Sequence, residues 1–285
     1  MQATKPDSEG KRRYHPCGRC PACKKNNATS WAIRCYHESL SHNFNSFLTL
    51  TYDDDFLLPS KHRAYPGSLS KEHFQDFIKN FRYYYGKDVR YFCGGEYGDK
   101  GNRPHYHVIL FGVNVADSIF YDRLWVASKK GWSCRVKGWN KGYVFLLPLE
   151  LGGCFYCTKY CLKYDDKLLD ELKFVNQQTP FRLMSTRPGL GTDWFLKHKE
   201  EILYNGYIRF KGSKLAIPRF YYDKALPVGS LDREDYSNFR HGMFSKFSKE
   251  DRDKYNGLVG KGKLTWSELY ARLGDQQALN LKEKR

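Results

Sequence analysis

The sequence predicts an α+β fold, in which helices pack on one face of a single antiparallel sheet. Three segments rich in β-branched and aromatic residues, at 44–52, 89–97 and 105–112, have the composition of strands. Two others, after Ser70 and at 154–164, have the apolar spacing of amphipathic helices. The predicted order of the core is strand–helix–strand–strand–helix–strand–helix.

The first half of the core gives the clearest patterns. We expect a helix from Thr29, and residues 44–52 (FNSFLTLTY) alternate as a strand does. After the loop at 53–69 comes a helix that Ser70 could cap, because Ser is a favoured N-cap residue. Its apolar side chains follow the i, i+3, i+4, i+7 spacing of one helix face: Phe74, Phe77, Ile78 and Phe81. The segments 89–97 and 105–112 then form a hairpin around GDKGNRP.

The second half of the chain is less regular. We expect a short amphipathic helix around 116–128 and a β-rich region at 132–148 that Gly138 and Gly142 interrupt. Beyond about residue 172 the pattern weakens. The predicted domains are a basic, Cys-rich N-terminal segment at 1–28, a core at 29–171 and a basic accessory region at 172–285.

Two histidines stand two residues apart in the strand at 105–112. His105 and His107 project from the same face, because side chains alternate along a strand. The strand is apolar on both faces, which predicts a central position in the sheet. Glu96, on the preceding strand of the hairpin, could add a carboxylate. Two imidazoles and one carboxylate with open positions form a typical site for a divalent cation.

The segment 154–164 (CFYCTKYCLKY) predicts a helix with two unlike faces. One face is mainly cysteine and apolar, and the cysteines on it are read as core residues. Tyr156 and Tyr160 lie one turn apart on the other face, flanked by Lys159 and Lys163. On this segment alone, a basic surface helix whose tyrosines pack against a neighbour explains the pattern as well as a functional site does.

Composition indicates the kind of partner. The chain has 285 residues, a formal net charge of +17 and 16% aromatic residues, including 22 tyrosines. Basic charge interleaved with aromatic side chains favours nucleic acid as the partner. No apolar run is long enough to span a membrane and no signal or lipidation motif is found, so no membrane partner is expected. Nine cysteines without a secretory signal favour a reducing compartment.

Three further cysteines lie near the start of the chain, in HPCGRCPACKK. Cys17, Cys20 and Cys23 are spaced as metal ligands often are, and a fourth cysteine is missing nearby. His15, Cys35 or His37 could complete a tetrahedral zinc site. Reduced thiols in a loop containing Gly and Pro are the alternative.

Taken together, these motifs resemble the HUH endonucleases. The motifs occur in the family's order: FLTLTYDD, then GEYGDKGNRPHYHVILFG, then FYCTKYCLKY. PCGRCPACKKN, MSTRPGLG and IPRFYYDK are similar to segments of the replication initiators of microviruses, and of their gokushovirus branch in particular. The resemblance covers roughly residues 15–225, and the last sixty residues or so do not contribute to it.

The resemblance implies a palm-like fold, similar to an RNA-recognition motif, and a specific chemistry. Tyr156 or Tyr160 would attack a phosphodiester of single-stranded or origin DNA, with Lys159 and Lys163 positioning the phosphate. A 5′-phosphotyrosine would form, and the free 3′ hydroxyl would prime rolling-circle replication. Glu96, His105 and His107 would hold Mg²⁺ or Mn²⁺. The implied setting is the cytoplasm of a bacterial host, with the viral origin and the host DNA polymerase and helicase as partners.

Two alternatives remain from the sequence. A non-catalytic, zinc-containing nucleic-acid-binding regulator would explain the charge and the N-terminal cysteines, but not the paired histidines and tyrosines. A relaxase or transposase of the same superfamily would share the chemistry. The absence of a GxxxxGK[ST] motif disfavours the larger relatives that carry a helicase.

Overall fold

The structure, a computed structural model, describes residues 2–3, 14–15, 17–99, 101–160, 166–210, 212–227, 229–233 and 235–236. The chain divides into two compact units. One unit is Ala28–His198, and the other combines Met1–Asn27 with Lys199–Arg285. The sheet and the predicted histidine pair belong to the first unit, which therefore positions the candidate site.

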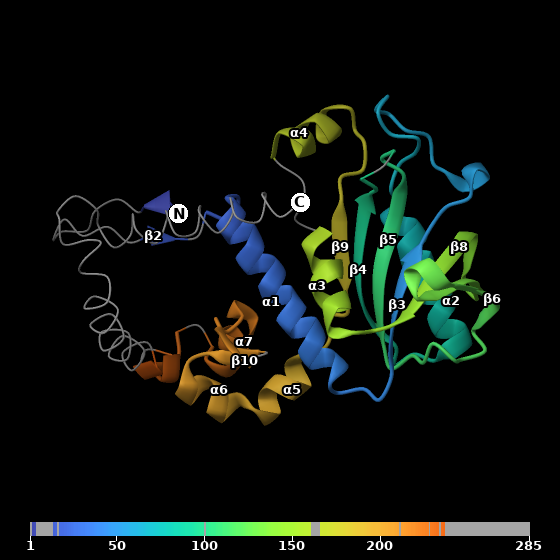
Figure 1. The fold of residues 1–285 in the computed structure, drawn as a ribbon. Coiled ribbons are helices and arrows are strands. Elements are labelled where there is room, and N and C mark those ends of the chain that lie inside the picture. The colour runs from blue at the N-terminus through green and yellow to red at the C-terminus, as the bar shows by residue number, and fades with distance from the viewer. Residues whose placement is uncertain are drawn as a thin grey trace. The chain divides into compact units, whose positions relative to one another are not determined.

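The first unit is built on a seven-stranded antiparallel sheet with the order β6-β7-β8-β3-β5-β4-β9 (Figure 1). The strands are β3 (Asn45–Leu50), β4 (Arg90–Tyr97), β5 (Pro104–Phe111), β6 (Phe120–Val126), β7 (Gly131–Val136), β8 (Trp139–Pro148) and β9 (Phe181–Met184). The helices are α1 (Pro21–Ser39), α2 (Lys71–Tyr85), α3 (Leu151–Tyr160), α4 (Asp166–Phe174) and α5 (Thr192–Lys197), with short 3-10 turns at Asp54–Phe56 and Ala127–Lys129. The α+β class and the central position of the strand with two histidines are confirmed, because β5 lies between β3 and β4.

Helices pack on both faces of this sheet, so the expectation that they cover one face is wrong. On one face, side chains of α2 pack with Val108 and Leu110 of β5. On the other, Cys35 of α1 and the buried cysteines of α3 pack with Ile109 and Phe111 (Figure 1). The physical reason was already in the sequence: a strand that is apolar on both faces needs cover on both.

Helix α2 forms as its sequence predicts. Ser70 is the N-cap, and its hydroxyl accepts a hydrogen bond from the His73 N–H at 3.0 Å. Gly86 follows the last turn with a φ of 137°, a conformation that side chains rarely adopt. The helix buries the four predicted apolar side chains: Phe74, Phe77, Ile78 and Phe81.

The helix expected around 116–128 is wrong, because β6 occupies Phe120–Val126 and pairs with β7. Its pairing register shifts between Tyr121 and Leu124, and Asp122 has a φ of +52°. A bulge of this kind breaks the two-residue alternation by which a strand is recognised. The aromatic and β-branched composition of the segment nevertheless favours a strand once a neighbouring strand is available for pairing.

The ends of the elements also differ from the prediction at two places. Helix α1 begins at Pro21 rather than near Thr29, and Pro is favoured at the first position of a helix because its missing N–H would be unpaired there. Strand β9 pairs with β4, so the sheet continues past residue 171, where the sequence pattern weakens. The compact unit accordingly reaches His198.

The second unit contains short elements. They are β1 (Gln2–Ala3), β2 (Tyr14–His15), α6 (Lys199–Asn205), β10 (Ile208–Phe210), β11 (Ser213–Leu215) and α7 (Arg219–Ala225). β1 pairs with β2, and β10 pairs with β11, both antiparallel. Among the described helices of the chain, none has the length and apolar character that crossing a bilayer requires.

Candidate metal centre and tyrosine helix

Strands β4 and β5 bring Glu96, His105 and His107 together. Glu96 pairs directly with His105 across the two strands, and His107 follows on the same face. Glu96 Oε1 lies 3.1 Å from His105 Nε2 and 3.0 Å from His107 Nε2. The two Nε2 atoms are 3.1 Å apart. One ligand atom from each of the three residues could therefore reach a single cation.

The second nitrogen of each imidazole is held by a neighbouring group. His105 Nδ1 lies 3.1 Å from the carbonyl oxygen of Arg103, which can only accept a hydrogen bond. A neutral His105 therefore carries its proton on Nδ1 and turns the lone pair of Nε2 toward Glu96. His107 Nδ1 lies 3.1 Å from the hydroxyl of Thr49, on the neighbouring strand β3. Partners of this kind orient imidazoles that bind metals.

The electrostatics of the group favour a cation. Burial opposes ionisation of Glu96, but hydrogen bonds from His105 and His107 outweigh it and lower the pKa of the carboxyl. Burial lowers the pKa of His107, against the opposing effect of its hydrogen bond to Glu96. A carboxylate and an imidazole lone pair facing each other at about 3 Å repel unless a proton or a cation lies between them.

The second carboxylate oxygen of Glu96 gives a separate indication. Oε2 is buried and has no hydrogen-bond partner among the described residues. A buried polar atom left unpaired is costly, so such an atom needs an explanation. Coordination of a divalent cation would supply one, since carboxylate oxygens and imidazole nitrogens are ordinary ligands for such ions.

Helix α3 places Tyr156 beside this group. The Tyr156 ring centroid lies 5.0 Å from that of His107, in an edge-on arrangement, and the side chain is 43% exposed. On the opposite side of the helix Cys154 and Cys157 are buried, as predicted, and the Cys157 thiol donates to the carbonyl oxygen of His107 at 3.4 Å. This contact fixes α3 against β5.

The other predicted residues of the helix are placed only in part. Tyr160 is the last residue of α3, one turn after Tyr156. The backbone of Lys159 also belongs to α3, but the side chains of Lys159 and Tyr160 lie outside the described part of the structure. Lys163 lies outside it altogether.

Sequence reasoning missed two residues at this centre. Thr49 contacts His107 Nδ1, and the Phe47 ring stacks on His107 with the centroids 5.7 Å apart. Both lie on the same face of β3, opposite the buried Leu48 and Leu50. The alternation of FNSFLTLTY carried this signal, because the polar Thr49 lies between two leucines on the face that the histidines share.

The N-terminal cysteines form a second group, in the other compact unit. The ligand atoms of Cys17, Cys20 and Cys23 lie within 4.8 Å of one another. The Cys20 N–H donates to Cys17 Sγ at 3.3 Å, and hydrogen bonds from the Cys20 and Arg19 backbone lower the Cys17 pKa to about 6. Thiolate character of this kind suits a metal ligand.

The three residues considered as a fourth ligand fare differently. Cys35 is buried in the core beside α3, and His37 is buried against Trp194 with the ring centroids 3.5 Å apart. Neither residue belongs to the cysteine group that the described residues form. His15 lies in β2, and its side chain is outside the described part.

Comparison with known proteins identifies the family. Residues 45–167, which include Glu96, His105, His107, Tyr156 and Tyr160, match a family of replication-associated proteins that is described under the name ORF2. The replication-associated protein VP4 of Bdellovibrio phage phiMH2K is 30% identical over 218 residues, or 73% of this chain. The chain belongs to the family of phage replication-associated proteins.

Two further relatives are similar over a larger part of the chain. The replication-associated protein ORF4 of Chlamydia phage 1 and the replication-associated protein ORF2 of Spiroplasma virus 4 are each 27% identical over 84% of it. The chain spans 66% of the Bdellovibrio phage protein and 61% of the Chlamydia phage protein, less than two thirds of each. No solved structure matches the chain.

Proposed function

We propose that this replication-associated protein nicks single-stranded or origin DNA by attack of a tyrosine on a phosphodiester. The observation that carries the proposal is the position of Tyr156, whose ring lies 5.0 Å from that of His107 and is partly exposed. A nucleophile beside a group that fits a cation is what cleavage of a charged phosphodiester needs. The same residues give the chain its resemblance to the HUH endonucleases.

In the proposed reaction, the phenol oxygen of one tyrosine forms a bond to phosphorus. The phenol loses its proton, and the bond from phosphorus to the 3′ oxygen breaks. The 3′ oxygen takes up a proton and leaves as a hydroxyl, while the 5′ phosphate stays linked to the tyrosine. Mg²⁺ or Mn²⁺ bound by Glu96, His105 and His107 would supply Lewis-acid stabilisation of the phosphate charge.

The chain's own residues have distinct parts in this proposal. Glu96, His105 and His107 are the ligands, and Thr49 and the Arg103 carbonyl orient the two imidazoles. Tyr156 and Tyr160 are the two nucleophiles, one turn apart on α3. Lys159 and Lys163 would position phosphates near them. The second tyrosine would cleave at the next passage of the origin while the first is still linked to DNA, and the released 3′ hydroxyl would then close a circle by reversing the first linkage.

The setting follows from the relatives. Their names describe replication-associated proteins of phages of Bdellovibrio and Chlamydia and of a virus of Spiroplasma, so we place the reaction in the cytoplasm of a bacterial host. The free 3′ hydroxyl would serve a host DNA polymerase, with a host helicase opening the duplex. The similarity of the N-terminal and C-terminal motifs to microvirus initiators supports a rolling-circle mechanism of this kind.

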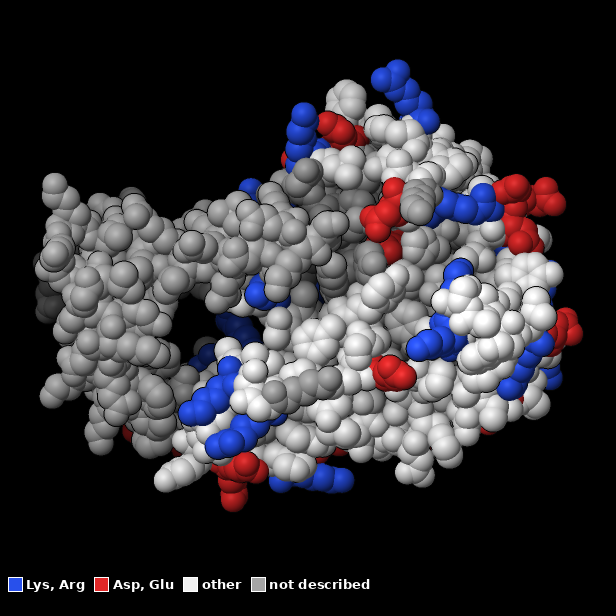
Figure 2. Space-filling model, viewed as in Figure 1, with Lys and Arg blue, Asp and Glu red and all other residues white. Residues whose placement is uncertain are grey.

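The surface charge is compatible with DNA as the substrate. The net charge is +17, and Lys and Arg side chains lie in several separate groups over the face seen in Figure 2, with Asp and Glu between them. Basic residues spread in this way suit a long polyanion better than one small anionic ligand.

A covalent adduct tests the function. The protein is incubated with Mn²⁺ and single-stranded oligonucleotides that tile the viral origin, denatured, and separated by electrophoresis. We expect a protein–DNA species that survives denaturation and whose linked peptide contains Tyr156 or Tyr160. Strong DNA binding without any adduct would instead favour the non-catalytic regulator.

A further inference from the structure

The metal centre belongs to a row of side chains that crosses the whole sheet. Directly paired residues of antiparallel strands share a face, so the row can be followed from strand to strand. From β9 to β6 it consists of Arg182, Gly94, His107, Thr49, Phe145, Ser133 and Leu124. The row connects the candidate metal centre with the far edge of the sheet.

The part of this face on β7 and β8 exposes aromatic rings that are paired with cations. Tyr143 lies two residues before Phe145 on the same face and is 50% exposed. The Arg135 guanidinium lies 4.1 Å from the centre of the Tyr143 ring. The Lys129 amine lies 5.2 Å from that of Phe145. Exposed rings beside cations are how proteins bind single-stranded nucleic acid, because bases stack on the rings and the cations attract phosphates.

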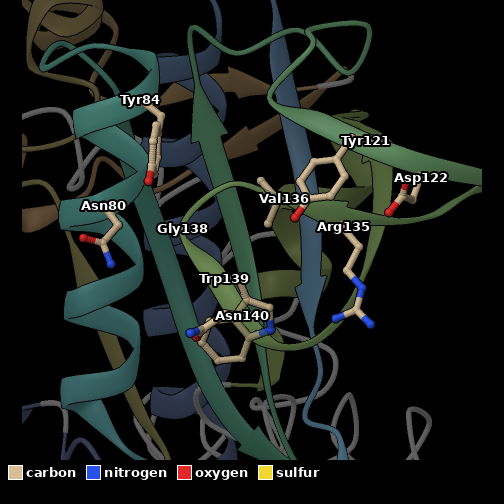
Figure 3. A pocket seen from close by; sticks show the side chains of 9 residues that line it. All are labelled: Asn80, Tyr84, Tyr121, Asp122, Arg135, Val136, Gly138, Trp139 and Asn140. Carbon is tan, nitrogen blue, oxygen red and sulfur yellow. The ribbon is translucent and has the colours of Figure 1, made fainter.

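A pocket of about 500 Å³ lies at the end of this face, where the β7–β8 hairpin meets α2 (Figure 3). Tyr84 projects from α2 on one side of the pocket and Tyr121 from β6 on the other, and they are 57% and 42% exposed. Asn80 and Asn140 add side-chain amides to the lining, and Arg135 belongs both to the pocket and to the cation–ring pair with Tyr143. The pocket is therefore continuous with the exposed face.

Two residues of the hairpin shape this pocket. Gly138 has a φ of +98°, and a Cβ at this position would lie 3.0 Å from the backbone nitrogen of Phe81 in α2. Only glycine allows the hairpin to approach the helix this closely. Trp139, which lines the pocket next to it, is buried, and its indole N–H donates to the Thr51 carbonyl oxygen at 3.0 Å. The pocket is thus built on rigid elements.

We propose that this pocket binds an unpaired nucleobase of the DNA strand that extends from the metal centre over Tyr143. The inference rests on the proposed function in taking DNA as the substrate, and it adds a recognition site away from the chemistry. Two rings from different elements offer stacking surfaces, and side-chain amides form hydrogen bonds with base edges. The volume falls in the range of sites for small organic groups, and the open mouth suits a base that stays attached to its strand.

Tyr84→Ala and Tyr121→Ala test the pocket, with Tyr83→Ala as the matched control. Tyr83 is the neighbour of Tyr84 on α2, is 83% exposed and does not line the pocket. Binding is measured by fluorescence anisotropy with a labelled single-stranded DNA pool of random sequence, in the presence of chelator so that no cleavage occurs. We expect each pocket variant to weaken Kd by roughly fivefold or more, because a stacked base is worth about 1–3 kcal/mol. Tyr83→Ala should bind as the wild type does.

A second measurement locates the base. The same pool carrying 5-iododeoxyuridine is irradiated with the wild-type protein, and the cross-linked peptides are identified by mass spectrometry. We expect cross-links at Tyr84 or Tyr121, and none with the same sequences annealed into a duplex. Equal affinities of all three variants, or cross-links confined to other peptides, would overturn the pocket.

These outcomes are independent of the proposed function. A wild-type protein that forms the covalent adduct while the pocket variants bind normally would reject the pocket and keep the chemistry. Weakened binding in the pocket variants without any adduct in the wild type would reject the chemistry and keep the pocket.

Discussion

His105 and His107 each present one ring nitrogen to the same small volume, because their other nitrogens are held by the Arg103 carbonyl and the Thr49 hydroxyl. Glu96 adds one oxygen between them and a second that has no partner in the described part of the structure. Four atoms with lone pairs around one point need positive charge to be stable there. Removing a ligand or the cation should therefore remove the reaction while leaving the fold of the sheet in place.

The first prediction concerns these ligands. His105→Ala and His107→Ala should reduce adduct formation to background, and chelator should do the same to the wild type, because stabilisation of the phosphate charge is lost. Single-stranded DNA binding should change little, since lysines and aromatic rings supply most of it. Adduct yield is measured on denaturing gels and binding by anisotropy, and addition of excess Mn²⁺ should restore the chelated wild type. Undiminished cleavage in chelator would reject the metal centre.

Thr49 gives a second prediction at this scale. Its hydroxyl lies 3.1 Å from His107 Nδ1, so Thr49→Val keeps the shape of the side chain and removes the hydrogen bond. Loss of a group that orients a ligand typically weakens metal affinity by roughly 10–100-fold. The Mn²⁺ concentration that gives half-maximal adduct should rise accordingly, and Thr49→Ser should restore it. A maximal yield that falls at saturating Mn²⁺, with unchanged half-saturation, would contradict a positioning role.

Among the elements, α3 determines which tyrosines face the cation site. Its buried side holds Cys154 and Cys157 against β5, so Tyr156 points outward beside His107. Tyr160 follows one helical turn later, where a residue of the same face is expected.

The third prediction follows from this spacing. Phenylalanine keeps the ring and removes the nucleophilic oxygen, so the Tyr156→Phe and Tyr160→Phe variants should fold normally and lose only chemistry. Each should retain one round of nicking, and neither should release a closed circle. The double variant should form no adduct, and Tyr164→Phe should resemble the wild type. Gels of adduct and circular product distinguish these cases, and an adduct in the double variant would mean that another residue is the nucleophile.

The elements that position the site were predictable, and those at the sheet edges were not. β4, β5 and α2 have strong local patterns, and the alternation of PHYHVILF alone placed the histidines on one face of a central strand. β6 was mistaken for a helix because the bulge after Tyr121 interrupts its alternation. The contact of Thr49 with His107 depends on a pairing between residues far apart in the chain, which no local pattern specifies.

The packing of α1 against α5 gives a fourth prediction, on pH. Burial, and then the charge of His198, lower the pKa of His37 to about 3, and its ring stacks on Trp194. The unfolded chain binds a proton at this residue below about pH 6.5, whereas the folded protein does not until about pH 3. Stability should therefore fall with decreasing pH by about 1.4 kcal/mol per unit below pH 6.5 from this residue.

His37→Phe tests this dependence. The variant keeps a flat ring and binds no proton, so its free energy of unfolding should fall less steeply from about pH 6.5 to about pH 5, above the range in which carboxylates titrate. Urea denaturation at several pH values measures the difference in slope. Equal slopes in the variant and the wild type would show that His37 does not remain neutral in the folded protein.

At the scale of the whole molecule, the two compact units each contain one group of residues that could hold a metal. The histidine centre lies in Ala28–His198, and the cysteine group lies in the unit that contains Met1–Asn27. Their donor atoms differ in kind. Imidazole and carboxylate ligands with open positions suit an exchangeable Mg²⁺ or Mn²⁺, whereas thiolates suit a tightly held Zn²⁺. The two sites should therefore be separable by chelation.

The fifth prediction is that the purified protein carries about one tightly bound zinc per chain, held by Cys17, Cys20 and Cys23. Dialysis against a mild chelator should remove the activating cation and leave this zinc, because three thiolates bind it strongly. Metal analysis of protein prepared under reducing conditions measures the content. Cys20→Ser should lose most of the zinc, whereas Cys134→Ala, a change at a buried cysteine of the sheet, should keep it. Zinc-free wild-type protein would make the three residues ordinary thiols, with the short N–H contact of Cys17 as a feature of the start of α1 only.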